Sequence, residues 1–164
     1  MSNSSVKLNL DGMGAVRAAL EKGNKMRVQV GLFSNRANRS NVRGDSKITN
    51  PTLGAIHEFG SATKKIPSRS WLFWPIAAHL QDRIERVGRA VWRALIAKKG
   101  LKPAYATLGV EAELVVQEGF DTSGWGGWEA NKPATIRRKG SSKPLIDSAQ
   151  FRKAVSSRVV GGGP

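Results

Sequence analysis

The chain has 164 residues, no cysteine and a formal net charge of +15, from 27 Lys and Arg against 12 Asp and Glu. This length fits one domain, and the absence of cysteine excludes disulfides, thiolate zinc sites and cysteine nucleophiles, and fits synthesis in a reducing cytoplasm. We expect no membrane span and no secretory signal, because no apolar run is long enough for either.

The charge imbalance is large enough for the chain to repel itself, so we expect a partner that neutralises it. That partner is nucleic acid, an acidic protein or a membrane surface. The competing interpretation is that the charge is a general aid to solubility. Clustering of the basic residues favours a partner.

The first part of the chain predicts a small β-α-β unit. Residues 6–10 alternate apolar and polar, as in a strand. Asp11 can cap a helix that runs to about Lys22 and ends at Gly23. Residues 26–33 alternate again and predict a half-buried strand.

Residues 34–50 have almost no apolar content, and their four cations (Arg36, Arg39, Arg43 and Lys47) face a single Asp. A loop of this length inside a compact domain is usually functional or disordered. We therefore expect a flexible basic loop that becomes ordered on assembly.

Two helices are predicted next. Asn50 can cap a short helix over 51–59 that has Pro51 at its first position and stops at Gly60. Ser68 or Ser70 can cap a helix over 71–99, which would be about 43 Å long. Its apolar residues recur at steps of three and four and form a packing seam, with an arginine stripe beside it. The seam is Phe73, Ala77, Leu80, Ile84, Val87, Val91 and Ala94, and the stripe is Arg83, Arg86, Arg89 and Arg93.

The C-terminal part is less regular. Residues 102–120 suit either a helix or, in part, a strand, and we favour the helix. Residues 119–144 predict a loop. A short helix is expected from Asp147 or Ser148 to Ala154, then a strand over 156–160 and a frayed tail over 161–164. The whole chain thus predicts a single α+β domain over 1–164: a small, mostly antiparallel sheet packed against one long helix plus shorter helices, with long mobile loops.

Catalytic patterns are weak in this sequence. His57-Glu58 lacks the second histidine that a metal-binding helix needs four residues away. No nucleophile elbow and no phosphate-binding loop occurs. We therefore predict a protein that is not an enzyme and has no metal or cofactor. A hydrolase that uses His57 and Glu58 stays a minor alternative, because a triad is assembled in space.

Trp125 and Trp128 lie in a glycine-rich loop and have three interpretations: stacking on bases, anchoring a subunit interface, or a lid over the core. The basic loops could line a channel for duplex DNA or dock on acidic neighbours, without base-specific readout. The predicted interface residues are Arg36, Arg39, Arg43, Phe59, Lys64, Lys65, Arg69, Trp125 and Trp128. Those predicted to face DNA or an acidic partner are Arg83, Arg86, Arg89, Arg93, Arg137, Arg138 and Lys139.

Two blocks carry a family resemblance. Gly54, His57-Glu58-Phe59-Gly60 and Ile66-Pro67-Ser68-Arg69 lead into the predicted helix at Trp71, and Lys143-Pro144-Leu145 precedes Asp147, Phe151 and Ser156. In this order the blocks resemble the neck and tail-completion proteins of tailed bacteriophages, the phage virion morphogenesis proteins. One departure is Ala149, where the family usually has glycine.

The resemblance implies a non-enzymatic virion protein at the head–tail junction, made in the host bacterial cytoplasm and assembled as a homo-oligomeric ring of six or twelve copies. The implied protein partners are the connector, head-closure and tail-terminator or tail-tube proteins. The resemblance also implies that the protein could contact packaged double-stranded DNA, without sequence specificity, and that it has no membrane partner. The alternative function is a free, sequence-independent nucleic-acid-binding protein.

Overall fold

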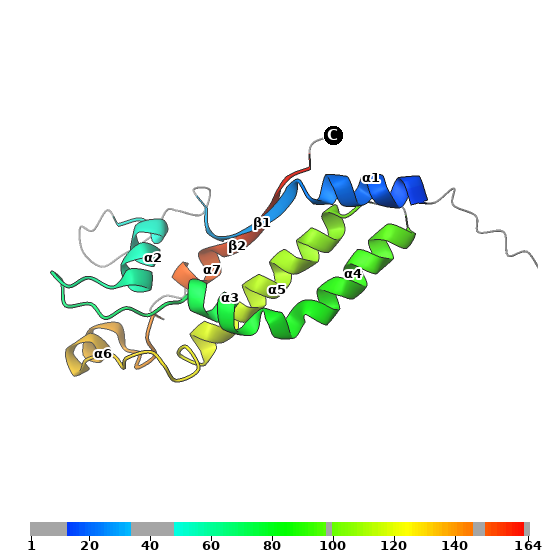
Figure 1. Ribbon diagram of the computed structural model, residues 1–164. Helices are drawn as coiled ribbons and strands as arrows, with labels where there is room; N and C mark the ends of the chain where they lie inside the picture. Colours follow the sequence, from blue (N-terminus) through cyan, green and yellow to red (C-terminus); the bar gives the residue numbers. More distant parts are fainter. Residues whose placement is uncertain (1–12, 34–47, 98–99, 146–149, 163–164) are drawn as a thin grey trace, which may run out of the picture.

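The computed structural model describes residues 13–33, 48–97, 100–145 and 150–162 (Figure 1). The fold is α+β, as predicted. The elements in chain order are α1 (Met13–Gly23), β1 (Met26–Leu32), α2 (Asn50–Phe59), α3 (Phe73–His79), the 3-10 turn η2 (Gln81–Arg83), α4 (Ile84–Ile96), α5 (Lys102–Asp121), α6 (Pro133–Lys139), α7 (Gln150–Ala154) and β2 (Val155–Gly161).

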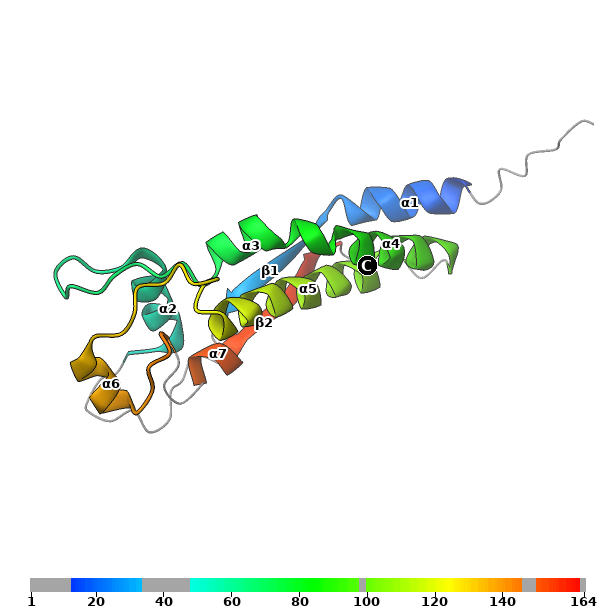
Figure 2. The same cartoon turned by 90° about the horizontal axis from the view of Figure 1, so that it is seen from below.

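The molecule is elongated, with different elements at its two ends (Figures 1 and 2). Helix α1 and the end of α4 lie at one end. Helices α2 and α6, with the loop between α2 and α3, lie at the other. Helices α3, α4 and α5 and the sheet connect them. None of the described helices is both long and apolar enough to cross a membrane.

The sheet has two antiparallel strands, whose register runs from Met26 opposite Gly161 to Leu32 opposite Val155. The strands predicted over 26–33 and 156–160 are confirmed. The tail prediction is wrong at Gly161, which is paired in β2, because the backbone of this strand reaches the start of β1. The strand predicted over 6–10 lies outside the described residues.

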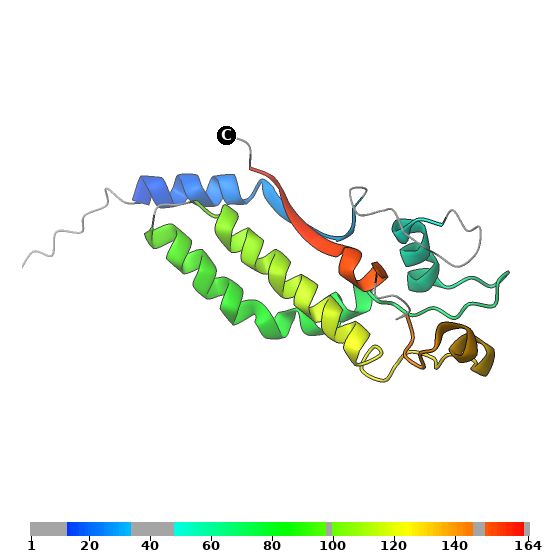
Figure 3. The same ribbon diagram turned by 180° about the vertical axis from the view of Figure 1, so that it is seen from behind.

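Helix α5 lies along the sheet, as seen from behind in Figure 3, and the helical interpretation of this segment is confirmed. Gly109 lets the helix approach the sheet closely, because a Cβ there would lie only 3.0 Å from the Cβ of Ser157 on β2. A core cluster gathers at the C-terminal half of α5. It consists of Trp71, Val116, Phe120, Phe151 and Val155.

The single helix predicted over 71–99 is wrong, because the described part of this segment bends at η2 into α3 and α4. The bend lets α3 cover the C-terminal end of α5, where the ring of Pro75 lies against Gly119. Helix α4 instead follows the rest of α5. The predicted seam is split by this bend: Ala94 is buried, whereas Phe73 is 75% exposed. The longest helix is therefore α5.

Two smaller predictions also need correction. The loop predicted over 119–144 contains α6, which has Pro133 in its first turn and ends at Gly140 in the left-handed conformation. The N-cap of α2 is Thr49 and not Asn50, because the Thr49 hydroxyl accepts a hydrogen bond from the amide of Thr52. The predicted start of α7, at Asp147 or Ser148, lies outside the described residues.

Candidate assembly surface

Glu58 connects the end of α2 to the start of α3. Its carboxylate accepts hydrogen bonds from the backbone amides of Trp71 (2.9 Å), Leu72 (3.0 Å) and Phe73 (3.1 Å). These amides open α3 and have no partner within the helix, and a negative charge there is favourable. The Ser70 hydroxyl donates to Glu58 and accepts from the amide of Trp74. Ser70 and Glu58 therefore cap the start of α3 together.

Gly60 precedes a short basic hairpin over residues 61–66. Its φ of +75° lies in the left-handed region, and a Cβ there would come within 2.9 Å of the Ser68 amide nitrogen. Ser61 and Ile66 then pair through their backbones. This geometry places Lys64 and Lys65 at the exposed tip of the loop.

Arg69 lies inside the subunit, although we predicted it at an interface. The residue is only 7% exposed. Its guanidinium donates to the backbone carbonyl of Glu129 at 2.9 and 2.7 Å. Burial lowers the pKa of this guanidinium from its usual value, against the opposing effect of the Glu129 charge. Arg69 therefore ties the segment before α3 to the segment before α6.

The two sequence blocks that carry the family resemblance meet at this junction. The Trp71 indole donates to the Gly54 carbonyl at 2.9 Å. The Phe151 ring packs edge-on against Trp71, with centroids 4.9 Å apart, and against His57 at 6.1 Å. His57 also accepts a hydrogen bond at its backbone carbonyl from the Arg69 amide. His57 and Glu58 thus have structural roles here.

Both tryptophans of the glycine-rich loop contact the subunit itself. The Trp125 ring stacks on His79, with centroids 3.9 Å apart and an interplanar angle of 17°. The Trp128 ring packs on Phe120, and its indole nitrogen donates to the Ser70 carbonyl. Of the three interpretations, this geometry matches the lid over the core.

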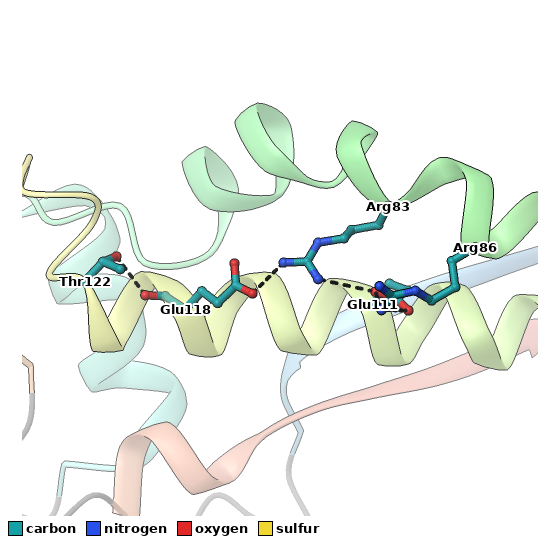
Figure 4. A network of polar contacts seen from close by, with 5 residues as sticks. All are labelled: Arg83, Arg86, Glu111, Glu118 and Thr122. Atoms are coloured by element: carbon teal, nitrogen blue, oxygen red, sulfur yellow. Dashed lines mark hydrogen bonds and ion pairs between the residues drawn. The ribbon is translucent and has the colours of Figure 1, made fainter.

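Two arginines of the stripe, Arg83 and Arg86, form ion pairs with acids of α5 (Figure 4). Arg83 binds Glu118 and approaches Glu111, and Arg86 binds Glu111 at 2.9 and 3.1 Å. The hydrogen bond with Glu118 raises the pKa of Arg83. Because Glu111 is only 3% exposed, these two arginines neutralise a buried carboxylate and hold α4 on α5. The Arg83 side chain is mostly covered, whereas that of Arg86 is 54% exposed, so the predicted role of Arg86 in facing DNA or an acidic partner stays a prediction.

The other two arginines of the stripe are exposed. Arg89 lies near Glu85 at 3.5 Å, a surface pair within one helix. Such pairs contribute little to stability, and they leave the charge accessible to a partner. Arg93 is exposed as well. That Arg89 and Arg93 face DNA or an acidic partner stays a prediction.

Exposed cations gather at the end of the molecule that carries α2 and α6 (Figure 2). Residues 60–72 and 128–145 contain eight Lys and Arg and one acid, Glu129. Lys139 is half-buried and donates to a backbone carbonyl. We define the distal basic surface by its fully exposed members. They are Lys64, Lys65, Lys132, Arg137, Arg138 and Lys143.

Phe59 is 80% exposed at the end of α2, directly before this hairpin. A large exposed aromatic side chain next to cations is typical of an interface anchor. Its interface role, like that of Lys64 and Lys65, stays a prediction. Arg36, Arg39 and Arg43 lie outside the described residues. No group of three metal-binding side chains occurs in the described part of the chain.

Comparison with protein-family models, with curated proteins and with solved structures finds no match for this chain. A functional assignment therefore depends on the two sequence blocks and on the geometry of the surface they build. Sequence reasoning missed the capping role of Glu58 and the ion pairs of Glu111. The available signal for Glu111 was an acid inside the mostly apolar stretch from Leu108 to Val116, which also contains Glu113.

Proposed function

We propose that this protein is a structural virion protein of a tailed bacteriophage that joins head and tail at their junction, as part of a ring. One observation carries the proposal: the two blocks that resemble neck and tail-completion proteins form a single unit in space. Trp71 and Phe151 are the contact between them. Their contact supports the proposal, because it makes the two blocks parts of one structural unit.

The distal basic surface supplies the docking chemistry for this role. Its cations lie on a short hairpin, on α6 and on the residues that flank α6, and Glu58 and Arg69 connect these segments to the rest of the subunit. A rigidly placed cluster of one sign attracts an oppositely charged surface and fixes its orientation. The partners we propose are acidic faces of the connector, head-closure, tail-terminator or tail-tube proteins, with packaged DNA as a further polyanion nearby.

The test is a complementation experiment in which a phage lacking this gene is supplied with variants of the chain. The double variant Lys64→Glu/Lys65→Glu reverses the charge of the hairpin tip. We expect free heads and tails to accumulate, with few joined particles in electron micrographs. The matched control is Lys22→Glu/Lys25→Glu, which makes the same charge change on exposed residues near α1.

Normal particle yield from the hairpin variant would remove the distal basic surface from head–tail joining. A reconstruction of the finished particle tests the wider proposal. It should contain density for this subunit in a ring between head and tail. Absence of the chain from finished particles would contradict a structural virion role.

The same cations favour one second function, sequence-independent nucleic-acid binding by the free subunit. Phosphate contacts release counterions, so log affinity would fall by about 0.9 per contact for each log unit of salt. Titrating a fluorescent duplex at several salt concentrations measures this slope. Tight binding by the isolated subunit at physiological salt would favour this second function, whereas a ring component should bind weakly alone.

A further inference from the structure

Helix α4 carries an apolar stripe that faces away from α5. Ile84, Gly88, Trp92 and Ile96 follow at intervals of four residues. At about 100° of rotation per residue these positions share one flank of the helix. The three large side chains are exposed, Trp92 by 66% and Ile96 by 65%. Among the described residues, nothing covers this stripe.

A second apolar stripe lies on α5. Val110 and Leu114 are one helical turn apart, and both are exposed. They lie on the flank of α5 that is next to Glu111, and Glu111 faces Arg86 of α4. Ile84 and Trp92 lie on the other side of α4 from Arg86, at about 100° of rotation per residue. The helical positions therefore place the two stripes on opposite flanks of the α4–α5 pair, with the ion pair of Arg86 and Glu111 between them.

The charge of this helical pair suits contact with a second copy. Helix α4 contains three arginines and one acid, and α5 contains one lysine and four acids. The sum is four basic and five acidic residues, so the pair is nearly neutral although the chain carries +15. Two copies can approach here without bringing like charges together, whereas contact between two distal basic surfaces would be repulsive.

Gly88 leaves a shallow gap between the larger side chains of the α4 stripe. A Cβ at this position would meet no described atom within 4 Å, so packing inside the subunit does not require glycine there. Glycine in the middle of an exposed helix is unfavourable compared with alanine. In a helix interface, a glycine lets a side chain of the neighbouring helix insert between its larger neighbours, here Ile84 and Trp92.

We propose that the α4 stripe of one subunit binds the α5 stripe of a second copy, in a head-to-tail contact. The two stripes are different surfaces, so each bound subunit still presents one free stripe. Repetition of such a contact produces a ring if the rotation closes and a filament if it does not. The inference rests on the proposed function for its biological setting, since it identifies the contact between subunits of the proposed ring.

The experiment is sedimentation velocity of the full chain over a wide range of subunit concentrations, with variants that block one stripe each. Trp92→Glu blocks the α4 stripe, and Leu114→Glu blocks the α5 stripe. Each variant alone should lose self-association by about tenfold or more, as expected for a central interface residue. Leu20→Glu is the matched control, because it introduces the same charge at an exposed apolar side chain of α1, outside both stripes, and should associate like the unmodified chain.

Mixing the two blocked variants distinguishes a head-to-tail contact from a symmetric one. Each variant retains the stripe that the other has lost, so the mixture should form dimers that neither variant forms alone. These dimers cannot grow, because only the two blocked stripes remain free. Dimerisation of Leu114→Glu alone would show a symmetric α4–α4 contact and would overturn the proposal.

Gly88→Gln provides an independent variant that preserves folding. The new side chain meets no other described group of its own subunit, but it fills the gap at position 88 of the α4 stripe. We expect an unchanged circular dichroism spectrum and about tenfold weaker association. A monomer at every concentration of the unmodified chain would overturn the inference and would leave the charge-reversal test of head–tail joining intact. Failure of that test with self-association retained would instead count against the proposed function alone.

Discussion

The ring of Phe151 packs edge-on against the indole of Trp71, with centroids 4.9 Å apart. Phe151 belongs to α7, and Trp71 stands two residues before α3. Phe120 of α5 completes the cluster, 5.6 Å from Phe151 and 6.1 Å from Trp71. Three segments that are distant in the sequence thus share one aromatic core beneath the distal basic surface.

Phe151→Ala should therefore destabilise the whole subunit. Phe151 is buried, and truncating a buried aromatic side chain leaves a cavity and removes its contacts with both rings. We expect a loss of about 3–5 kcal/mol in the free energy of unfolding, measured by urea denaturation. Phe59→Ala is the control, since this residue is 80% exposed and should change stability by about 0.5 kcal/mol or less. Equal losses for both variants would contradict the assigned core.

Glu58→Gln tests the cap on α3. The amide keeps the size of the side chain but loses the charge and one of the two acceptor oxygens, so some of the four donors at the junction lose their partner. Donors left without an acceptor and a weakened cap should lower the free energy of unfolding by about 2–3 kcal/mol. Amide hydrogen exchange should also rise at the start of α3.

Glu21→Gln is the matched control for the cap. It removes one carboxylate from an exposed pair with Arg17 on α1. Such pairs contribute about 0.5 kcal/mol or less. A similar effect of the two substitutions on stability would mean that Glu58 does not cap α3.

The ion pairs between α4 and α5 predict strong coupling between Arg86 and Glu111. Glu111→Leu should cost about 2–3 kcal/mol, because it removes the partner of two arginines. Arg86→Met alone leaves a buried carboxylate with a single partner, Arg83. The double variant should lose less than the sum of the two single losses, since neither group is then left alone. Denaturation of all four proteins measures the coupling, and strictly additive losses would contradict it.

Local patterns were sufficient for most of the helices and strands. Alternation gave the strand at residues 26–33, and proline followed later by glycine gave the helix that ends at Phe59. The bend at η2 could not be predicted in this way. It depends on Pro75 meeting Gly119 and on Arg83 reaching Glu118, and both partners lie on another helix. A periodic seam continues through such a bend without any change in pattern.

The candidate surface was predictable only in part. Phe59, Lys64 and Lys65 are exposed as expected from a turn rich in polar residues. Arg69 belongs to the same basic segment but is buried. Its guanidinium donates hydrogen bonds to the backbone carbonyl of Glu129, which lies far along the chain. Charge alone does not distinguish a cation that faces solvent from one that satisfies internal acceptors. The same holds for aromatic residues: Trp128 lies in a glycine-rich loop, yet its ring packs on Phe120 of the same subunit.

Gly60→Ala should be among the most damaging substitutions of a glycine in the motif block. The position has a φ of +75°, which is costly for a residue with a side chain, and the new Cβ would lie 2.9 Å from the Ser68 amide nitrogen and 3.0 Å from the Ile66 carbonyl oxygen. Both neighbours are backbone atoms, so relief requires the hairpin to move. We expect a loss of about 2–4 kcal/mol, measured by urea denaturation.

Gly126→Ala separates the backbone strain at Gly60 from the steric contact. Gly126 has a similar φ of +80°, but a Cβ there would meet no described atom within 4 Å. This variant should lose only about 1 kcal/mol, the cost of the left-handed conformation alone. The difference between the two variants then measures the contact with the hairpin backbone together with the added cost of ψ −176° at Gly60. Because that contact positions Lys64 and Lys65, Gly60→Ala should also weaken head–tail joining at temperatures where the subunit stays folded, and Gly126→Ala should not.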